Sequence, residues 1–175
     1  GLGYSLLLTR PYVDDYVCVM LADECYVGSN HEEILATDYR SFLATCAVLV
    51  TDALELIETN YAVYAESGLV RRIVEKPKPT DGALLGLGTF VLSPQFYDHL
   101  EAALAAGLRS DPVSVLGRLC EAGERIAPFH LRGLYVNINN RDALNLAGVV
   151  VRAHNFSACT LGLALIMKGS AEDTS

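Results

Sequence analysis

Val70-Arg71-Arg72-Ile73-Val74-Glu75-Lys76-Pro77 combines an apolar strand pattern with an acid–base pair, and Pro77 stops the strand directly after that pair. Ligands of open α/β sheets gather at the carboxyl ends of strands, so Glu75 and Lys76 lie where a binding site is expected. Lys76 could neutralise a phosphate, and Glu75 could accept hydrogen bonds from sugar-type hydroxyls. The alternative is a solvated charge pair at a strand end, and the pair by itself does not decide between the two.

The segments around this stretch predict an α/β fold with a mixed, mostly parallel sheet flanked by helices. Residues 61–65 and 69–74, joined by the turn Glu66-Ser67-Gly68, predict a β-hairpin that brings Glu75 and Lys76 to the same edge as Asn60 and Tyr61. The continuously apolar segment 16–21 is typical of a strand buried on both faces of a parallel sheet. Further strands are expected at 45–50, 84–92, 125–131, 134–138 and 160–167, and helices at 31–42, 94–105, 112–122 and 141–154.

Three helix starts carry capping signals. Ser29-Asn30 precedes the helix expected from His31, and Ser93-Pro94 and Asp111-Pro112 each place a capping side chain before a proline in the first turn. These signals predict where the helices begin.

Composition limits the classes of function. The chain has 175 residues, of which 51% are hydrophobic and 19% charged, enough for one sizeable core. A net charge of -8 without a run of Lys and Arg argues against nucleic acid as a partner. The five cysteines are an odd number and widely spaced, which favours reduced thiols in a cytoplasmic protein. The longest apolar run is shorter than the roughly 20 residues of a membrane span, and no signal peptide is visible.

Two further segments contain candidate ligand-binding residues. Asp23 follows the strand at 16–21, where α/β enzymes place a metal-binding aspartate; a turn or helix cap is the alternative. Gly1-Leu2-Gly3 predicts a loop that a ligand can approach closely and that runs into a short helix before Leu8, although a plain turn would have the same sequence. The strand at 84–92 contains two glycines, which often mark a close approach of a ligand or another backbone.

The order of these motifs is more specific than any one of them. It runs Gly-Leu-Gly-x-Ser-Leu, Leu-Ala-Asp, Val-Glu-Lys-Pro, a Gly-x-Gly strand with Ser-Pro-x-x-Phe, and Tyr-Val-Asn-Ile-Asn-x-x-Asp-Ala-Leu. From Gly1 to about Ala153 the chain resembles the sugar-phosphate nucleotidyltransferase family, of the glucose-1-phosphate thymidylyltransferase kind. The resemblance implies a Rossmann-like nucleotidyltransferase fold.

On the nucleotide side, the resemblance implies roles for five residues. Gly1, Leu2 and Gly3 match a segment that contacts the nucleotide base. Asp23 matches the aspartate that contacts the nucleotide through the catalytic Mg²⁺. Asn137 lies where many relatives carry a second magnesium-binding aspartate; an amide can still coordinate Mg²⁺ through its oxygen but brings no charge.

On the sugar side, Glu75 and Lys76 match the pair that grips the sugar and its phosphate. Gly88 matches the strand that borders the sugar pocket, and Ala62 stands where a glycine commonly lets the sugar approach. The implied catalytic residues are therefore Asp23 and Lys76.

The implied reaction belongs to nucleotide sugar biosynthesis in the cytoplasm. A sugar-1-phosphate, or another phosphorylated alcohol, attacks the α-phosphate of a nucleoside triphosphate and releases pyrophosphate. Two polyanions must meet, so Mg²⁺ held by Asp23 and the ammonium of Lys76 would offset their repulsion. A homo-oligomer is also considered.

Departures from the family pattern qualify this expectation. The Gly-rich segment that opens the family's domain is absent, so we expect an N-terminally truncated fold in which residues 1–155 form the C-terminal part of a nucleotidyltransferase domain. The isolated chain is predicted to be inactive. Ala22 and Ala62 stand at glycine positions, and Asn137 is neutral.

Two alternatives remain open. A non-catalytic domain of the same fold would bind a nucleotide or sugar phosphate without turnover, as Ala22, Ala62 and Asn137 favour. The chain could also belong to a glycosyltransferase fusion, because the tail at 156–175, with Leu161 to Met167 before Lys168-Gly169-Ser170, resembles the first strand of a family-2-type glycosyltransferase.

Overall fold

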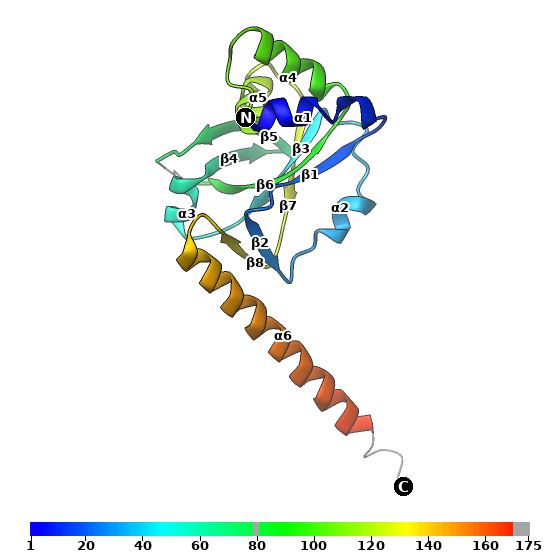
Figure 1. Cartoon of the computed structure of the whole chain (residues 1–175), viewed down its shortest axis with the longest axis vertical. Helices are drawn as coiled ribbons and strands as arrows, with labels where there is room; N and C mark the ends of the chain where they lie inside the picture. Colours follow the sequence, from blue (N-terminus) through cyan, green and yellow to red (C-terminus); the bar gives the residue numbers. More distant parts are fainter. Residues whose placement is uncertain (79–80, 170–175) are drawn as a thin grey trace. The chain divides into compact units, whose positions relative to one another are not determined.

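The computed structural model describes residues 1–78 and 81–169, and side chains there except those of Leu35 and residues 156–169. The chain forms two compact units (Figure 1). Unit 1 comprises Gly1–Leu21 and His31–Leu131, and unit 2 comprises Ala22–Asn30 and the chain from Arg132 onward.

Unit 1 is built on a six-stranded sheet in the order β5-β4-β6-β3-β7, with β1 also paired to β6. The strands are β1 (Val17–Met20), β3 (Ala44–Leu49), β4 (Tyr61–Glu66), β5 (Leu69–Glu75), β6 (Leu84–Leu92) and β7 (Ile126–His130). The predicted mixed α/β sheet flanked by helices is confirmed. Its mostly parallel pairing is wrong: β6 runs antiparallel to all three of its neighbours, β4 and β5 form the predicted hairpin, and among the described strands only β3 and β7 pair in parallel.

Helices flank this sheet, and α1, α4 and α5 gather on one side of it in Figure 1. The helical segments of unit 1 are α1 (Leu2–Leu7), the 3₁₀ turn η1 (Arg10–Tyr12), α2 (Glu32–Ala36), α3 (Leu54–Thr59), α4 (Phe96–Ala105) and α5 (Pro112–Glu121). Phe90 of β6, Phe96 and Leu100 of α4, and Leu116 of α5 are at most 1% exposed and belong to one core cluster. Each such side chain contributes roughly 1.5–3 kcal/mol through burial.

The capping predictions have different outcomes. At α5 the Asp111 side chain accepts a hydrogen bond from the Ser114 N–H at 2.9 Å, with Pro112 in the first turn, as predicted. The helix expected from 31 to 42 ends at Ala36 and begins after His31 without a side-chain cap. Asn30 instead accepts the Arg132 N–H at 2.8 Å, and α4 begins after Gln95, not after Ser93.

Strand β1 is not buried on both faces, contrary to the prediction. Val17 and Val19 pack against the core, whereas Cys18 is exposed and Met20 is 53% exposed. Among the described strands β1 pairs with β6 alone. The apolar residues of the segment give no information on this pairing, so they did not predict the exposure of Cys18 and Met20.

Unit 2 contains a two-stranded antiparallel ribbon and a long helix. The ribbon pairs β2 (Glu24–Val27) with β8 (Leu134–Asn137), and α6 spans Arg141–Gly169. Residues 160–167 are thus helical, and the predicted strand there is wrong because Leu, Ala and Met favour a helix. The predicted domain boundary after residue 155 falls inside α6. Within residues 1–78 and 81–169, no helix combines the length and the apolar character that crossing a membrane requires.

Candidate functional site

Glu75 and Lys76 lie at the end of the β4–β5 hairpin, beside Asn60 and Tyr61, as predicted. Tyr61 lies opposite Glu75 in the strand register, and the Lys76 N–H donates to the Asn60 carbonyl at 2.8 Å. Lys76 has φ = 41°, in the left-handed region that few residues other than glycine adopt. The backbone thus leaves the sheet abruptly at Lys76, where an acidic and a basic side chain follow each other.

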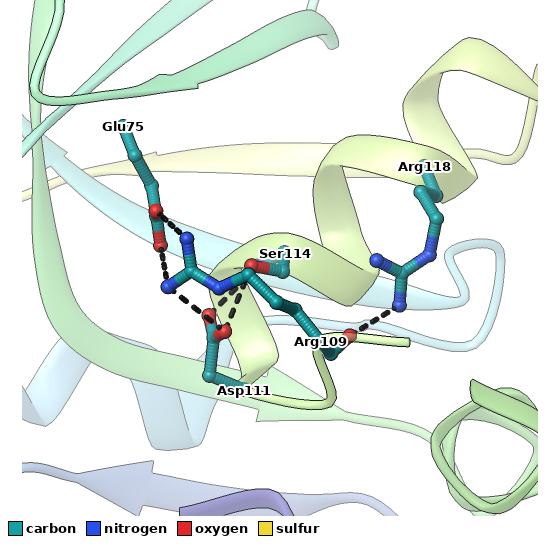
Figure 2. A network of polar contacts seen from close by, with 5 residues as sticks. All are labelled: Glu75, Arg109, Asp111, Ser114 and Arg118. Carbon is teal, nitrogen blue, oxygen red and sulfur yellow. Dashed lines mark hydrogen bonds and ion pairs between the residues drawn. The ribbon is translucent and has the colours of Figure 1, made fainter. Parts of the chain in front are cut away.

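The partner of Glu75 is Arg109, which follows α4 in the sequence (Figure 2). Arg109 Nη1 donates to Glu75 Oε2, and Arg109 Nη2 donates to Glu75 Oε1 at 3.0 Å. Nη2 also lies 3.3 Å from Asp111 Oδ2. The hydrogen bond that Arg109 donates to Glu75, followed by the charges of Asp111 and Glu75, raises the pKa of Arg109. The bidentate geometry fixes the orientation of the Glu75 carboxylate.

Sequence reasoning missed Arg109 because no pattern links it to Glu75, which lies 34 residues away. The available signal was the predicted cap at Asp111, two residues further on. Arg118 steadies the same loop by donating from Nη2 to the Arg109 carbonyl at 2.7 Å, as Figure 2 shows.

A cavity of about 410 Å³ lies beside this network, between β5 and α5. Its lining includes Glu75, Arg109 and Arg118 together with the apolar side chains of Ile73 and Val113. Glu121 lines it as well. Two carboxylates and two guanidinium groups beside an apolar wall can bind a ligand that carries both hydroxyl and anionic groups.

Ala62 and Gly88 lie within the sheet. Ala62 is fully buried, and the buried Gly88 accepts the Leu21 N–H at its carbonyl at 2.9 Å. At the other glycine of β6, a Cβ on Gly86 would lie 1.9 Å from Cε2 of Tyr61. The predicted close approach at a strand glycine is therefore made by a tyrosine ring at Gly86. The roles of Ala62 and Gly88 in a sugar pocket stay predictions.

The amino-terminal segment is helical earlier than expected, because α1 begins at Leu2. A Cβ on Gly3 would lie 1.8 Å from the Ser110 carbonyl oxygen, so the absence of a side chain lets α1 pack against the loop that carries Arg109. The loop predicted over Gly1-Leu2-Gly3 is thus wrong beyond Gly1. Contact of the three residues with a nucleotide remains a prediction.

The two residues that were assigned to magnesium both belong to unit 2, at the same end of the ribbon. The Asp23 carbonyl accepts the Ile138 N–H at 2.7 Å, which extends the ribbon by one step beyond the pairing of Glu24 with Asn137. Asp23 is exposed, and the Oδ1 atom of Asn137 is shielded from solvent.

Glu24, which follows Asp23 directly in the chain, is a further carboxylate at this end of the ribbon. Tyr26 Oη donates to Glu24 Oε2, and Tyr135 Oη donates to Glu24 Oε1 at 3.0 Å. Burial, followed by the charge of Glu24, raises the pKa of Tyr135. The alternation Glu24-x-Tyr26 and Tyr135-x-Asn137 was the signal that could have identified this group.

These residues fit a magnesium site of the substrate-assisted kind. Among the side chains that the structure describes, no group of three or more His, Cys, Asp and Glu residues could hold a metal ion by itself. Mg²⁺ is usually bound by one or two carboxylates plus substrate phosphates and water, not by an all-protein cage. One carboxylate from Asp23 and one amide oxygen from Asn137 agree with that chemistry.

Solved structures with the same fold include sugar-phosphate nucleotidyltransferases. A protein assigned as a glucose-1-phosphate thymidylyltransferase of Bacillus anthracis, in complex with sucrose, matches 87% of this chain with a TM-score of 0.71 and 14% identity. UDP-glucose pyrophosphorylase complexed with UDP-glucose matches 91% of the chain, with a TM-score of 0.66 and 18% identity. The inositol-1-phosphate CTP transferase of T. maritima matches 86%, with a TM-score of 0.66 and 18% identity.

The chain spans 61%, 63% and 61% of the length of these three structures. No protein-family model and no curated protein matches it in sequence. At these identities the likeness shows the fold, and it confirms the fold resemblance that the order of motifs predicted.

Proposed function

We propose that this chain is part of a sugar-phosphate nucleotidyltransferase. The enzyme would transfer a nucleoside monophosphate from a nucleoside triphosphate to a sugar-1-phosphate or a related phosphorylated alcohol. The observation that carries the proposal is the hairpin end, where Glu75 is held by Arg109 in two hydrogen bonds and Lys76 follows directly. The fold shared with enzymes named for glucose-1-phosphate, UDP-glucose and inositol-1-phosphate supports it.

Each residue has a role that its chemistry allows. Lys76 binds the phosphate of the acceptor, and Glu75, oriented by Arg109, accepts hydrogen bonds from hydroxyls of the sugar or alcohol. Asp23 and Asn137 would hold Mg²⁺, which when bound neutralises charge on the phosphates. Gly1 to Gly3 would contact the nucleotide base, with Ala62 and Gly88 bordering the sugar.

The chemistry needs little from the protein besides positioning and charge. A phosphate oxygen of the acceptor forms a bond to the α-phosphorus while the bond from that phosphorus to the bridging oxygen of pyrophosphate breaks. The attacking oxygen is already ionised, so no general base is required. Lys76 lowers the barrier because it offsets the repulsion between two anionic reactants.

The test is pyrophosphate release from each of the four nucleoside triphosphates with a panel of phosphorylated sugars and inositols, in the longest natural form of the protein. Lys76→Ala and Asp23→Asn are expected to lower kcat by about 100-fold or more, the scale of losing a preorganised charge. Lys78→Ala, which removes an exposed lysine two residues further on, is the matched control and should change little.

Two results would contradict the proposal. One is the absence of pyrophosphate release with every pair of substrates although the protein is folded. The other is a Lys76→Ala variant that is as active as the Lys78→Ala control, which would remove Lys76 from the site.

The second candidate is a domain of this fold that binds a nucleotide or a sugar phosphate without turnover. The neutral Asn137 and the fully buried Ala62 favour it, because the first weakens a magnesium site and the second offers a sugar no exposed surface. If calorimetry detects binding of a nucleotide or a sugar phosphate and no product is formed, the result would favour a binding domain and not an enzyme.

A further inference from the structure

We propose that Arg109 keeps the ammonium group of Lys76 available for an anionic ligand, because it binds the carboxylate that directly precedes Lys76 in the chain. This inference rests on the proposed function, in which Lys76 binds the phosphate of the acceptor. It gives Arg109 a role besides orienting Glu75 toward hydroxyl groups. Arg109 is a positioning residue in this role, since it acts on Lys76 only through Glu75.

The charges of Glu75 and Lys76 are adjacent in the chain and opposite in sign. A lysine that is paired with a carboxylate has to give up that ion pair before it can bind phosphate, so pairing between the two would weaken a phosphate site. The structure shows a different arrangement. Among the residues that it describes, no carboxylate lies within ion-pair distance of the Lys76 ammonium, and Lys76 is exposed.

Arg109 engages both oxygens of the Glu75 carboxylate. Nη1 donates to Oε2, and Nη2 donates to Oε1 at 3.0 Å. Such a contact between two planar groups fixes the whole carboxylate and not one oxygen only. Glu75 lines the cavity between β5 and α5, whereas Lys76 does not. The carboxylate is therefore directed toward Arg109 and the cavity, and its charge is compensated there.

The guanidinium of Arg109 is itself held in place (Figure 2). Its Nη2 lies 3.3 Å from Asp111 Oδ2, and Asp111 accepts hydrogen bonds from the N–H and the hydroxyl of Ser114. Arg118 holds the backbone of Arg109 by donating to its carbonyl at 2.7 Å. An arginine fixed at its side chain and at its backbone keeps hold of Glu75 without having to be ordered first.

The backbone of Lys76 is fixed on its own account. Its N–H donates to the Asn60 carbonyl at 2.8 Å, its φ of 41° is left-handed, and the following Pro77 is buried. Backbone conformations of this kind persist where the surroundings hold them, and they are frequent at functional sites. Lys76 thus combines a fixed backbone with an ammonium group that no described acid neutralises.

The test follows phosphate binding at Lys76 alone. Lysine occurs in the 175-residue chain at positions 76, 78 and 168, so each can be observed separately. Reductive methylation with carbon-13 formaldehyde keeps the charge of lysine, and replacing each lysine in turn by arginine assigns the methyl signals in nuclear magnetic resonance spectra. Titration with inorganic phosphate at constant ionic strength then measures binding at Lys76, with Lys78 as the internal comparison. Inorganic phosphate has no sugar hydroxyls, so contacts between Glu75 and a sugar do not enter.

Arg109→Gln releases Glu75, which can then pair with Lys76. It is expected to weaken phosphate binding at Lys76 about two- to fivefold, the range that one exposed ion pair gives. Glu75→Gln in the Arg109→Gln background removes the competing acid and should restore the original affinity. Arg71→Gln removes an exposed guanidinium of β5 without releasing an acid, so it is the matched control and should change little.

A conservative variant covers the case in which Arg109→Gln does not fold by circular dichroism. Arg109→Lys keeps the positive charge but has no fork with which to hold two oxygens. It should also weaken phosphate binding at Lys76, and Glu75→Gln should again restore it.

The outcomes separate this inference from the proposed function. If phosphate binds the Arg109 variant as it binds the unchanged chain, the role of Arg109 is overturned and the assignment of Lys76 to phosphate stands. Equal weakening by Arg71→Gln, or failure of Glu75→Gln to restore binding, overturns the role of Arg109 too. If phosphate does not move the Lys76 signal of the unchanged chain, or moves that of Lys78 equally, both assignments are overturned. Weakening with rescue supports the inference even if no pyrophosphate is released.

Discussion

Gly86 leaves no room for a side chain, because a Cβ there would lie 1.9 Å from Cε2 of Tyr61 and 2.3 Å from two further atoms of the ring. The ring is held in this position by its hydroxyl, which donates to the Leu87 carbonyl at 2.5 Å. Tyr61 also opens strand β4 directly opposite Glu75. Packing at Gly86 therefore supports the hairpin end that carries the candidate site.

Gly86→Ala is expected to lower the free energy of unfolding by about 1–3 kcal/mol, the usual cost of overpacking a well-filled core. Urea denaturation of the purified protein measures it. Gly117→Ala provides the matched control in the interior of α5, where the nearest atom to a new Cβ is 3.8 Å away. There the added methyl should stabilise the helix by up to about 1 kcal/mol. Equal effects of the two substitutions would show that the Tyr61 ring yields without cost.

Arg109 differs from a typical surface charge because it binds both Glu75 and Asp111. An exposed ion pair adds little to stability. The contacts of Arg109 with Glu75 and Asp111 therefore serve to orient the Glu75 carboxylate and contribute little to the stability of the fold.

Helix α5 connects the stability of an element to the candidate site. Asp111 accepts hydrogen bonds from the backbone N–H and the hydroxyl of Ser114, at 2.9 and 2.8 Å, while it also lies beside Arg109. One side chain thus caps the helix and positions the guanidinium that holds Glu75 (Figure 2).

Asp111→Ala is expected to cost about 1 kcal/mol of the free energy of unfolding, because the first turn of α5 loses its cap. Asp111→Asn keeps an oxygen that can cap and should lose much less, although it removes the charge beside Arg109. Urea denaturation of both variants measures the difference. The assignment of Asp111 as the cap would be wrong if alanine and asparagine had the same effect.

At the scale of the whole molecule, the core contains thiols that do not ionise readily. Burial raises the pKa of Cys46 to about 12 and that of Cys120 to about 11, from an ordinary value of 9.0. Between about pH 9 and pH 11 the unfolded chain therefore releases protons that the folded chain retains. Stability contributed by the neutral thiols is present below pH 9 and is lost as the pH rises above it.

The free energy of unfolding is expected to fall above pH 9 with a slope of up to about 1.4 kcal/mol per pH unit for each thiol. Urea denaturation at pH 8, 9 and 10 would measure the slope. Cys46→Ala removes one titrating group, so its slope between pH 9 and pH 10 should be shallower whatever its stability at pH 8. The same slope in both proteins would contradict the role of Cys46.

Much of the fold could be predicted from local patterns. The hairpin was predicted because Glu66-Ser67-Gly68 separates two β-rich runs, and α5 was predicted because Asp111-Pro112 is a strong start signal. The last part of the long helix α6 was not predicted. An apolar run such as 161–167 is compatible with a strand or a helix when the surrounding residues do not decide between them.

The sequence by itself determined most of the order of elements, although not strand β2 or the last part of α6. It also determined the place of Glu75 and Lys76 at a strand end and the likeness to sugar-phosphate nucleotidyltransferases. These features depend on residues that are close together in the chain. Tertiary structure alone decided that Arg109 clamps Glu75, that the Tyr61 ring fills the space at Gly86, and that Glu24 shares a face with Asn137. Such contacts join residues 25 to 113 positions apart, and they are fixed by strand register and packing, to which no local pattern of residues corresponds.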